Sequence, residues 1–271
     1  MNTPKEPRDT APDFPLAQPT VAVFSQTNHE MVVLGLIHRL GCPIVFLTDS
    51  RGSTRGAGTE EALRRIGHQA PVIFLDHSEN EFYRALLRRD ERLFAAVADR
   101  LAACLRDLRA KSVLTVPVEF YNPIHDTAPA VARRAIATSG LDAALYEAPL
   151  IYQSAGDRSY RINRFPPATQ QTLTYSVPRE LADLKFDLYR DVYHDLRAYL
   201  EKLGCPAPRE AFGTEHYRRA PAALEAPDSE RIVRYEERGM LLRKTGAVGE
   251  VISYREHFLP AMTRLLALGA R

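Results

Sequence analysis

Four short polar segments of this sequence carry the side chains that are able to do chemistry. The segments are SQTNHE (25–30), TDSRGSTRG (48–56), DHSEN (76–80) and EFYNPIHD (119–126). Together they supply imidazole, carboxylate, amide and guanidinium groups, which act as acids, bases, metal ligands or hydrogen-bond partners of a polar substrate. We therefore expect the functional site to be built from these segments.

Each of these segments follows a short run of apolar and β-branched residues that is typical of a buried strand. The runs are Thr20–Phe24, Pro43–Asp49, Pro71–Asp76 and Ser112–Pro117. Helical patterns separate them, so the sequence predicts an α/β fold, a Rossmann-like three-layer sandwich with a mainly parallel sheet. In such a sheet the carboxyl ends of the strands lie at one edge, where ligands bind.

Further elements are predicted from apolar spacing and from helix-capping residues. The glycine-rich stretch RGSTRGAG (51–58) is interpreted as a loop, and strands are expected in ALYEAPLIYQ (144–153) and QTLTYSV (171–177). The predicted helices are Glu30–Leu40, 59–67, a long stretch through Arg109, Pro129–Ser139 with Asp126 or Thr127 as N-cap, Leu181–Leu203, and Tyr254–Leu268.

Composition excludes several classes of protein. The 271 residues include 36 lysines and arginines against 34 aspartates and glutamates, a formal net charge of +2, so no broad basic surface for nucleic acid is expected. Three separated cysteines spell out neither a disulfide framework nor a thiolate metal site. No apolar run is long enough for a signal peptide or a membrane span, so we expect a cytoplasmic protein without a membrane partner.

The domain organisation predicted from this pattern is simple. Five prolines within residues 1–19 prevent a regular element there, so a flexible N-terminal arm is expected over residues 1–18. Residues 19–271 are expected to form a single α/β domain. The sequence gives no indication of the oligomeric state.

Several motifs resemble the LmbE-like, or PIG-L, family of zinc-dependent N-deacetylases. PIVFLTDSRG (43–52) is similar to the second-strand segment of that family, and NPIHDTAPAVARRAI (122–136) is similar to its later His-Pro-Asp-His motif. KFDLYRDVYHDLRAYL, EHYRRAP and GEVISYREHFLP resemble its C-terminal half. The resemblance implies the LmbE-like deacetylase fold and a hydrolase that acts on a small N-acylated substrate such as an amino sugar.

The motif that carries the family's chemistry is altered in this chain. The family has His-Pro-Asp-Asp-Glu after its first strand, whereas SQTNHE places Gln26 at the first zinc ligand, Asn28 at the general base and His29 at the second ligand, with Glu30 unchanged. In NPIHD, His125 matches the third zinc ligand and Asn122 replaces a histidine that helps to stabilise the oxyanion. The resemblance thus implies a metal site of Gln26, His29 and His125.

Such a site would bind zinc weakly or not at all, because an amide oxygen is a poor zinc ligand and the anionic aspartate is lost. Asn28 accepts no proton at neutral pH, so another base is required. The candidate catalytic residues are Asn28, Glu30, Glu119, Asn122 and Asp126. The candidate substrate-binding residues are Asp49, Arg51, Arg55 and Tyr121, since arginines at a sheet edge suit a carboxylate or phosphate on a small-molecule substrate.

Two hypotheses about function remain open at this point. The first is a hydrolase-like enzyme acting on a small polar N-acylated, amino-sugar-like substrate through a divergent, metal-poor site. The alternative is a catalytically divergent or inactive LmbE-like protein that binds a small ligand or performs a metal-independent reaction. The identity of the substrate is not encoded in any motif of this sequence.

Overall fold

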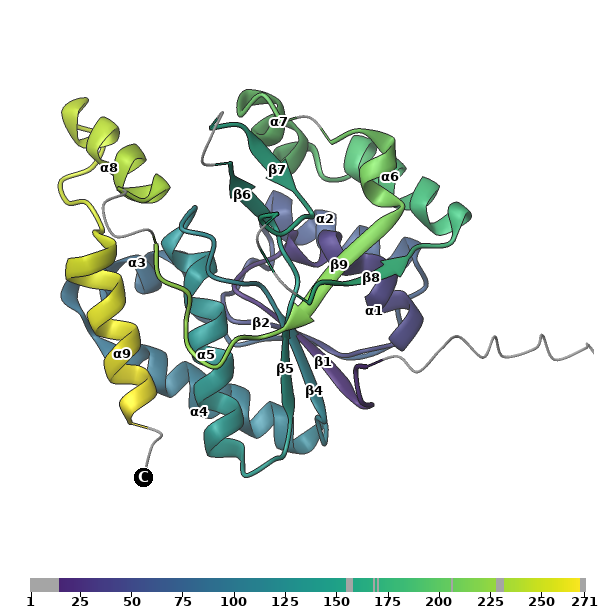
Figure 1. Cartoon of the computed structure of the whole chain (residues 1–271), viewed down its shortest axis with the longest axis horizontal. Helices are drawn as coiled ribbons and strands as arrows, with labels where there is room; N and C mark the ends of the chain where they lie inside the picture. The colour runs from purple at the N-terminus through teal and green to yellow at the C-terminus, as the bar shows by residue number, and fades with distance from the viewer. Residues whose placement is uncertain are drawn as a thin grey trace, which may run out of the picture.

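The computed structural model describes residues 15–154, 158–167, 169, 171–205, 207–227 and 232–268. Among these residues the strands are β1 (Thr20–Phe24), β2 (Ile44–Phe46), β3 (Val72–Phe74), β4 (Ser112–Thr115), β5 (Ala144–Glu147), β6 (Ile151–Gln153), β7 (Tyr160–Ile162), β8 (Leu173–Ser176) and β9 (Thr214–Arg219). Seven of them form one sheet in the order β3-β2-β1-β4-β5-β9-β8, and β6 pairs with β7 as a separate hairpin (Figure 1).

The α-helices in the described part of the chain are α1 (Leu34–Leu40), α2 (Thr54–Arg65), α3 (Glu79–Arg88), α4 (Glu91–Asp107), α5 (Pro123–Ser139), α6 (Arg179–Asp191), α7 (His194–Lys202), α8 (Arg234–Lys244) and α9 (Leu259–Ala267). Shorter turns of helix are η1 (His29–Val33), η2 (Arg209–Phe212) and the π-helical η3 (Tyr254–Phe258). No helix in these ranges is long and apolar enough to cross a membrane.

The strand order confirms the predicted mainly parallel α/β sheet. Strands β3, β2, β1, β4 and β5 are parallel neighbours, and only β9 and β8 run antiparallel at one edge. The chain leaves β1 toward β2 but leaves β4 toward β5, in the opposite direction along the sheet. Because both crossovers are right-handed, α1 and α5 cover opposite faces, and the strand order reverses between β1 and β4.

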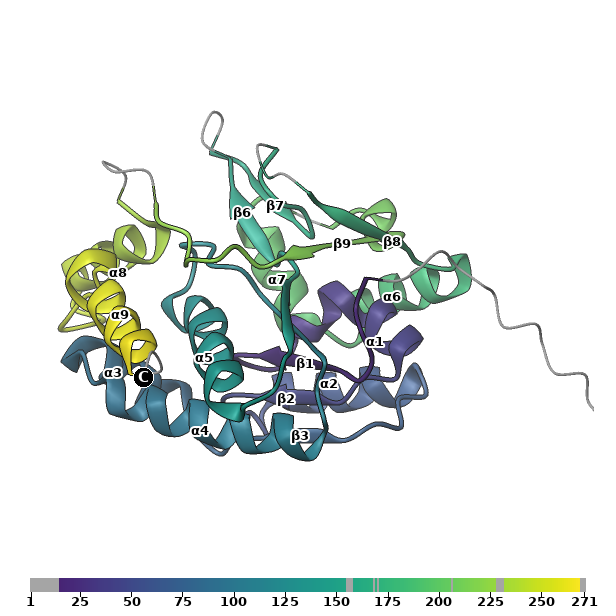
Figure 2. The same cartoon turned by 60° about the horizontal axis from the view of Figure 1, so that its bottom comes forward.

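Both faces of the central strands are buried, as their continuous apolar sequences require. Every residue of β1, β2 and β4 is buried. On one face α5 packs against β1, β4 and β5 and is itself covered by α4 and α9 (Figure 2). The predicted strand Thr20–Phe24 is reproduced residue for residue.

Several sequence predictions of local structure were wrong at their boundaries. The stretch 51–58 is not all loop, because Ser53 caps α2 by accepting a hydrogen bond from the Gly56 amide, so α2 begins at Thr54. Similarly, α5 begins at Pro123 because the Asn122 side chain, and not Asp126 or Thr127, accepts the Ile124 amide at 3.0 Å.

The predicted long helix 181–203 is two helices, α6 and α7. Val192, with φ −121° and ψ −48°, leaves the helical conformation between them. The interruption positions Tyr193, whose hydroxyl donates to Glu30 Oε1 at 2.6 Å. A side-chain contact with a residue far away in sequence therefore overrides the local helical pattern.

The predicted N-terminal arm of residues 1–18 lies only partly within the described residues. Residues 1–14 are outside them. At its end the chain packs on the fold: Leu16 is buried, and the Tyr146 hydroxyl donates to the Pro15 carbonyl at 2.8 Å. Pro15 and Leu16 thus contact the fold, and the flexible arm over residues 1–18 stays a prediction.

Candidate functional site

The candidate site lies at the point where the strand order reverses. His29 follows β1 and His125 follows β4, and these two parallel strands are neighbours in the sheet. Their carboxyl ends diverge into elements on opposite faces, which leaves a crevice between them. The sequence predicted both histidines as site residues, and the fold brings them together.

The two imidazoles are in direct contact. His29 Nε2 and His125 Nε2 are 3.1 Å apart, and the ring planes meet at 77°. Burial, the neighbouring His125 ring and the Arg55 guanidinium lower the pKa of His29 well below its usual range, and burial together with Arg55 lowers the pKa of His125 to about 3. Both rings are therefore neutral at pH 7, and a single N–H lies between the two facing nitrogens.

Gln26 determines which nitrogen carries that hydrogen. In the amide orientation that satisfies all its neighbours, its oxygen accepts from His125 Nε2 at 3.0 Å and from Arg55 Nη1 at 2.9 Å, while its nitrogen donates to Glu79 at 3.0 Å. His125 therefore carries its proton on Nε2. This one N–H is shared between the Gln26 oxygen and His29 Nε2, which both accept from it. The other nitrogen of His29, Nδ1, then donates to the Ser25 hydroxyl at 3.3 Å.

An ion pair completes this cluster. Arg55, in the first turn of α2, contacts Glu79, the first residue of α3, at 3.1 Å. The two charges cancel locally, and both side chains remain about one-third exposed. The polar end of the site thus contains a neutral amide, two neutral imidazoles and a compensated ion pair.

These residues form one end of a cavity of about 370 Å³. Asn28 and Asn122 also line it, and Asn122 uses its oxygen to cap α5, while its amide nitrogen has no hydrogen-bond partner among the residues that the structure describes. Asn28 has a left-handed backbone (φ 71°), a conformation that asparagine adopts more readily than most residues. The remaining walls are mostly apolar or aromatic, with the charged side chains of Asp195 and Arg238 among them; the apolar and aromatic residues include Val32, Tyr121, Leu150, Leu196, Tyr199 and Phe212.

The donor set does not fit a zinc ion, although its spacing is close to what zinc needs. Ligand atoms at about 2.0–2.1 Å from a tetrahedral zinc lie roughly 3.3 Å apart, near the distances among Gln26, His29 and His125. One of the three donors is a neutral amide oxygen, however, which is a poor zinc ligand, and the Arg55 guanidinium group contacts it. Within the described ranges no cluster of three or more histidine, cysteine, aspartate or glutamate residues is able to hold a metal. Zinc binding at these residues stays a sequence prediction without support from their chemistry.

Three carboxylates predicted as possible bases have other partners, and none of them lines the cavity among the described residues. Glu30 Oε1 accepts from the Thr59 and Tyr193 hydroxyls at 2.8 and 2.6 Å. Asp126 accepts from the backbone amides of Glu119 and Phe120. Glu30 thus joins segments that are distant in sequence, and Asp126 shapes the turn that precedes α5.

Glu119 plays a similar part beside Leu150 and Ile151, two residues that line the cavity. Its Oε1 accepts from the Leu150 and Ile151 amides at 2.7 and 2.9 Å, which fixes the start of β6. Burial raises the pKa of Glu119 well above its usual range and that of Asp126 to about 8. Their catalytic roles remain predictions, and the geometry shows them holding loops.

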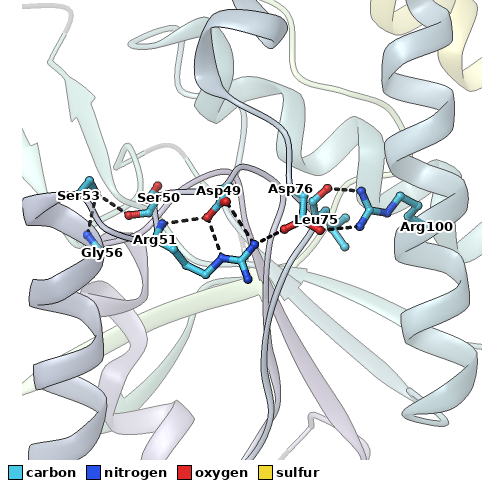
Figure 3. Close-up of polar contacts among 8 residues, drawn as sticks. All are labelled: Asp49, Ser50, Arg51, Ser53, Gly56, Leu75, Asp76 and Arg100. Atoms are coloured by element: carbon cyan, nitrogen blue, oxygen red, sulfur yellow. Dashed lines mark hydrogen bonds and ion pairs between the residues drawn. The ribbon is translucent and has the colours of Figure 1, made fainter.

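Asp49 and Arg51, predicted to bind substrate, lie in a separate chain of ion pairs (Figure 3). Arg51 contacts Asp49 at 3.0 Å and also contacts Asp76, which in turn pairs with Arg100 at 3.2 Å. None of these four side chains lines the cavity in the part of the chain that the structure describes. Of the predicted substrate-binding residues, Arg55 and Tyr121 line it.

Many of the cavity's residues escaped the sequence prediction, among them Glu79, Tyr83, Tyr199 and Arg238. The sequence did contain a signal for Glu79, because this residue lies in the polar segment 76–80 that follows β3. The other three lie on helices, with a helical pattern that does not distinguish a cavity wall from an exposed face.

Comparison with known proteins gives fold-level likeness only. No protein-family model matches the chain, and no curated protein matches it significantly. Among solved structures, it is similar to a deacetylase triple mutant of the teicoplanin biosynthetic pathway (12% identity, 75% of this chain and 99% of that one, TM-score 0.47). It is also similar to the A40926 pseudoaglycone deacetylase Dbv21 (12% identity, 76% and 98%, TM-score 0.49).

A third similar structure is the conserved protein TT1542 from Thermus thermophilus, with 18% identity, coverage of 78% of this chain and 98% of that one, and a TM-score of 0.46. The resemblance expected from the sequence is to a deacetylase family, and deacetylases are among these neighbours. Identities this low assign no activity to this chain and no role to its residues.

Proposed function

We propose that this chain binds a small molecule with an uncharged polar head, such as an amide, and an apolar or aromatic body. The observation that carries this proposal is the buried pair of neutral imidazoles, His29 and His125, at the polar end of the cavity. The head lies against these rings and Asn122, and the body packs on the apolar walls. The N-acyl amide expected from the sequence suits the head, whereas the walls favour a less polar body than a sugar.

The charge balance beside His29 and His125 supports an uncharged head. A charged group brought into a buried site without a partner loses its hydration at a cost of several kcal/mol. Arg55 and Glu79 already satisfy each other, so neither needs a counter-ion from the ligand. A neutral carbonyl or N–H instead gains hydrogen bonds without leaving an unpaired charge.

A second candidate is hydrolysis of that amide by a deacetylase-like route that uses no metal. It is favoured by the free amide nitrogen of Asn122 beside His125 in the cavity, because this donor is able to stabilise a developing oxyanion. Imidazoles with lowered pKa values are weak bases, so proton transfer from water to His29 would be slow. The binding function therefore remains the conclusion that the geometry favours.

The test uses 4-nitroacetanilide, an aromatic acetamide whose hydrolysis releases coloured 4-nitroaniline. We expect calorimetry to show binding to the wild type and an affinity roughly tenfold lower for His125→Ala, the loss of about one hydrogen bond. His77→Ala is the matched control, since His77 follows β3 without lining the cavity among the described residues. No binding to the wild type, or equal loss in both variants, would overturn the proposal.

The same mixture distinguishes the two candidates. Binding without release of 4-nitroaniline supports the ligand-binding function and removes the hydrolase. Release that survives exhaustive chelation and disappears in Asn122→Ala supports metal-independent hydrolysis. Release that chelation abolishes, and that added zinc restores, would contradict the metal-free interpretation of the site.

A further inference from the structure

A second, apolar cavity adjoins the first beneath α8. Its volume is about 620 Å³, and it shares Tyr83, Tyr121, Asn122 and Arg238 with the first cavity. Its own walls come from α3, α8 and the segment that follows α8. They include the apolar side chains of Leu87, Leu242, Val248, Val251 and Ile252, and at the margin the polar side chains of Asn80 and Glu250.

One side chain that lines both cavities is weakly held. Arg238 is exposed, and its only hydrogen bond among the described residues is a long one, 3.5 Å, to the Tyr199 hydroxyl. It has no carboxylate partner in that part of the chain. Arg238 and Asn122 both line the two cavities, so a ligand that extends from the first cavity into the second would contact these side chains.

The far wall of the second cavity is closed by a tight contact. A Cβ atom at Gly239 would lie 2.6 Å from Val251 Cγ1, so α8 packs directly on the segment that follows it. The first turn of α8 is fixed as well: the Arg234 amide donates to the Phe120 carbonyl at 3.0 Å, and Glu237 pairs with Arg158 at 2.9 Å. The cavity is thus bounded by fixed elements.

We propose that the second cavity receives an elongated apolar tail of the ligand whose head occupies the first. This inference rests on the proposed function, because it needs a head bound near Asn122. The shared lining residues give continuity, and the apolar walls determine the chemistry of the tail: an alkyl chain or a flat aromatic extension. The ligand class is therefore a long neutral amphiphile and not a compact sugar.

The test is a chain-length series of linear primary amides, from butanamide to decanamide, measured by calorimetry. Each methylene buried in the second cavity should tighten binding by up to about fourfold until the space is filled. Leu242→Trp, which adds bulk inside this cavity, should end the gain at a shorter chain. Leu241→Trp is the matched control, since the neighbouring Leu241 is 59% exposed and lines neither cavity.

The outcomes separate the two proposals. If butanamide itself fails to bind the wild type, the proposed function fails. If butanamide binds but longer amides gain nothing, or if Leu242→Trp leaves the series unchanged, only the tail site is overturned. Equal effects of both tryptophan variants would also overturn it. If the Leu242→Trp variant does not fold, Leu87→Trp provides the same test, because it narrows the same cavity from α3.

Discussion

Two regions at the carboxyl edge of the sheet carry similar polar residues and behave differently. At the ends of β1 and β4, polar groups are buried, largely neutral and directed at a cavity. At the ends of β2 and β3, Arg51 and Asp76 are about half exposed and belong to a chain of ion pairs that satisfies its own charges. The difference follows from topology, because the crevice lies where the strand order reverses. Arg55 and Glu79, which follow β2 and β3, reach it, whereas Asp49, Arg51 and Asp76 do not line it among the described residues.

The largest expected effect tests whether Asp126, one of the polar residues after β4, has a structural role. Asp126→Ala removes the acceptor of two backbone amides, those of Glu119 and Phe120, and should lower the free energy of unfolding by about 3 kcal/mol. Denaturant titration measures it. Asp76→Ala, a carboxylate in the exposed chain, is the control and should change much less. Similar losses in the two variants would erase the distinction between the regions.

The next effect tests the chemistry of the donor set. Gln26→His places a third imidazole beside His29 and His125 in donor positions already spaced for a metal. The variant should be stabilised by about 2.7 kcal/mol at a zinc concentration about one hundred times its Kd. Thermal unfolding with and without zinc measures the gain, and the wild type should show none. An equal gain in the wild type would contradict the conclusion that its donors do not fit zinc.

The buried imidazoles also predict an acid-side loss of stability. The pKa of His125 is about 3 in the folded protein, below the ordinary value near 6.5 of the unfolded chain. The contribution of the neutral His125 ring to the free energy of unfolding is therefore full above about pH 6.5. It is lost as the pH falls toward 3, because in that range the ring takes up a proton only in the unfolded chain. Between about pH 6.5 and 5 the free energy of unfolding of the wild type should therefore fall by about 2 kcal/mol more than that of the His125→Gln variant. A wild-type curve parallel to that of the variant would mean that His125 is not buried as a neutral ring.

The buried carboxylates should act in the opposite direction. The raised pKa values of Glu119 and of Asp126, the latter about 8, mean that the folded protein holds these protons longer than the unfolded chain does. Their contribution is full at low pH and declines as the pH rises from about 4 toward 8. The acid-side loss assigned to His125 is therefore measured as the difference between wild type and variant at each pH.

The sequence was informative where structure depends on local pattern. The buried strand Thr20–Phe24 and the meeting of His29 with His125 follow from apolar runs and from the geometry of parallel strands. The partners of Glu30 could not be predicted, because Tyr193 is 163 residues away and interrupts a helix to reach it. Likewise, Glu119 holds amides 31 and 32 residues further along the chain. A carboxylate near a strand end has the same appearance in sequence whether it faces a cavity or a loop.

The smallest expected effect compares the two arginines that the sequence treated alike. Arg55 contacts the Gln26 oxygen at 2.9 Å and Glu79 at 3.1 Å at the end of the cavity. Among the described residues, the polar and ring contacts of Arg51 are with the carboxylates of its own chain of ion pairs and with the Phe74 ring. A lysine keeps the positive charge but loses the planar fork that holds two partners at once.

We therefore expect Arg55→Lys to weaken binding of 4-nitroacetanilide by a few-fold, because Gln26 loses a donor that orients its amide toward His125. Arg51→Lys should leave that affinity unchanged. Calorimetry on both variants measures the difference, and unfolding midpoints close to that of the wild type show that both remain folded. If Arg51→Lys weakened binding as much as Arg55→Lys, the exposed ion pairs would be coupled to the cavity, and the boundary between the two regions would have to be moved to include the ends of β2 and β3.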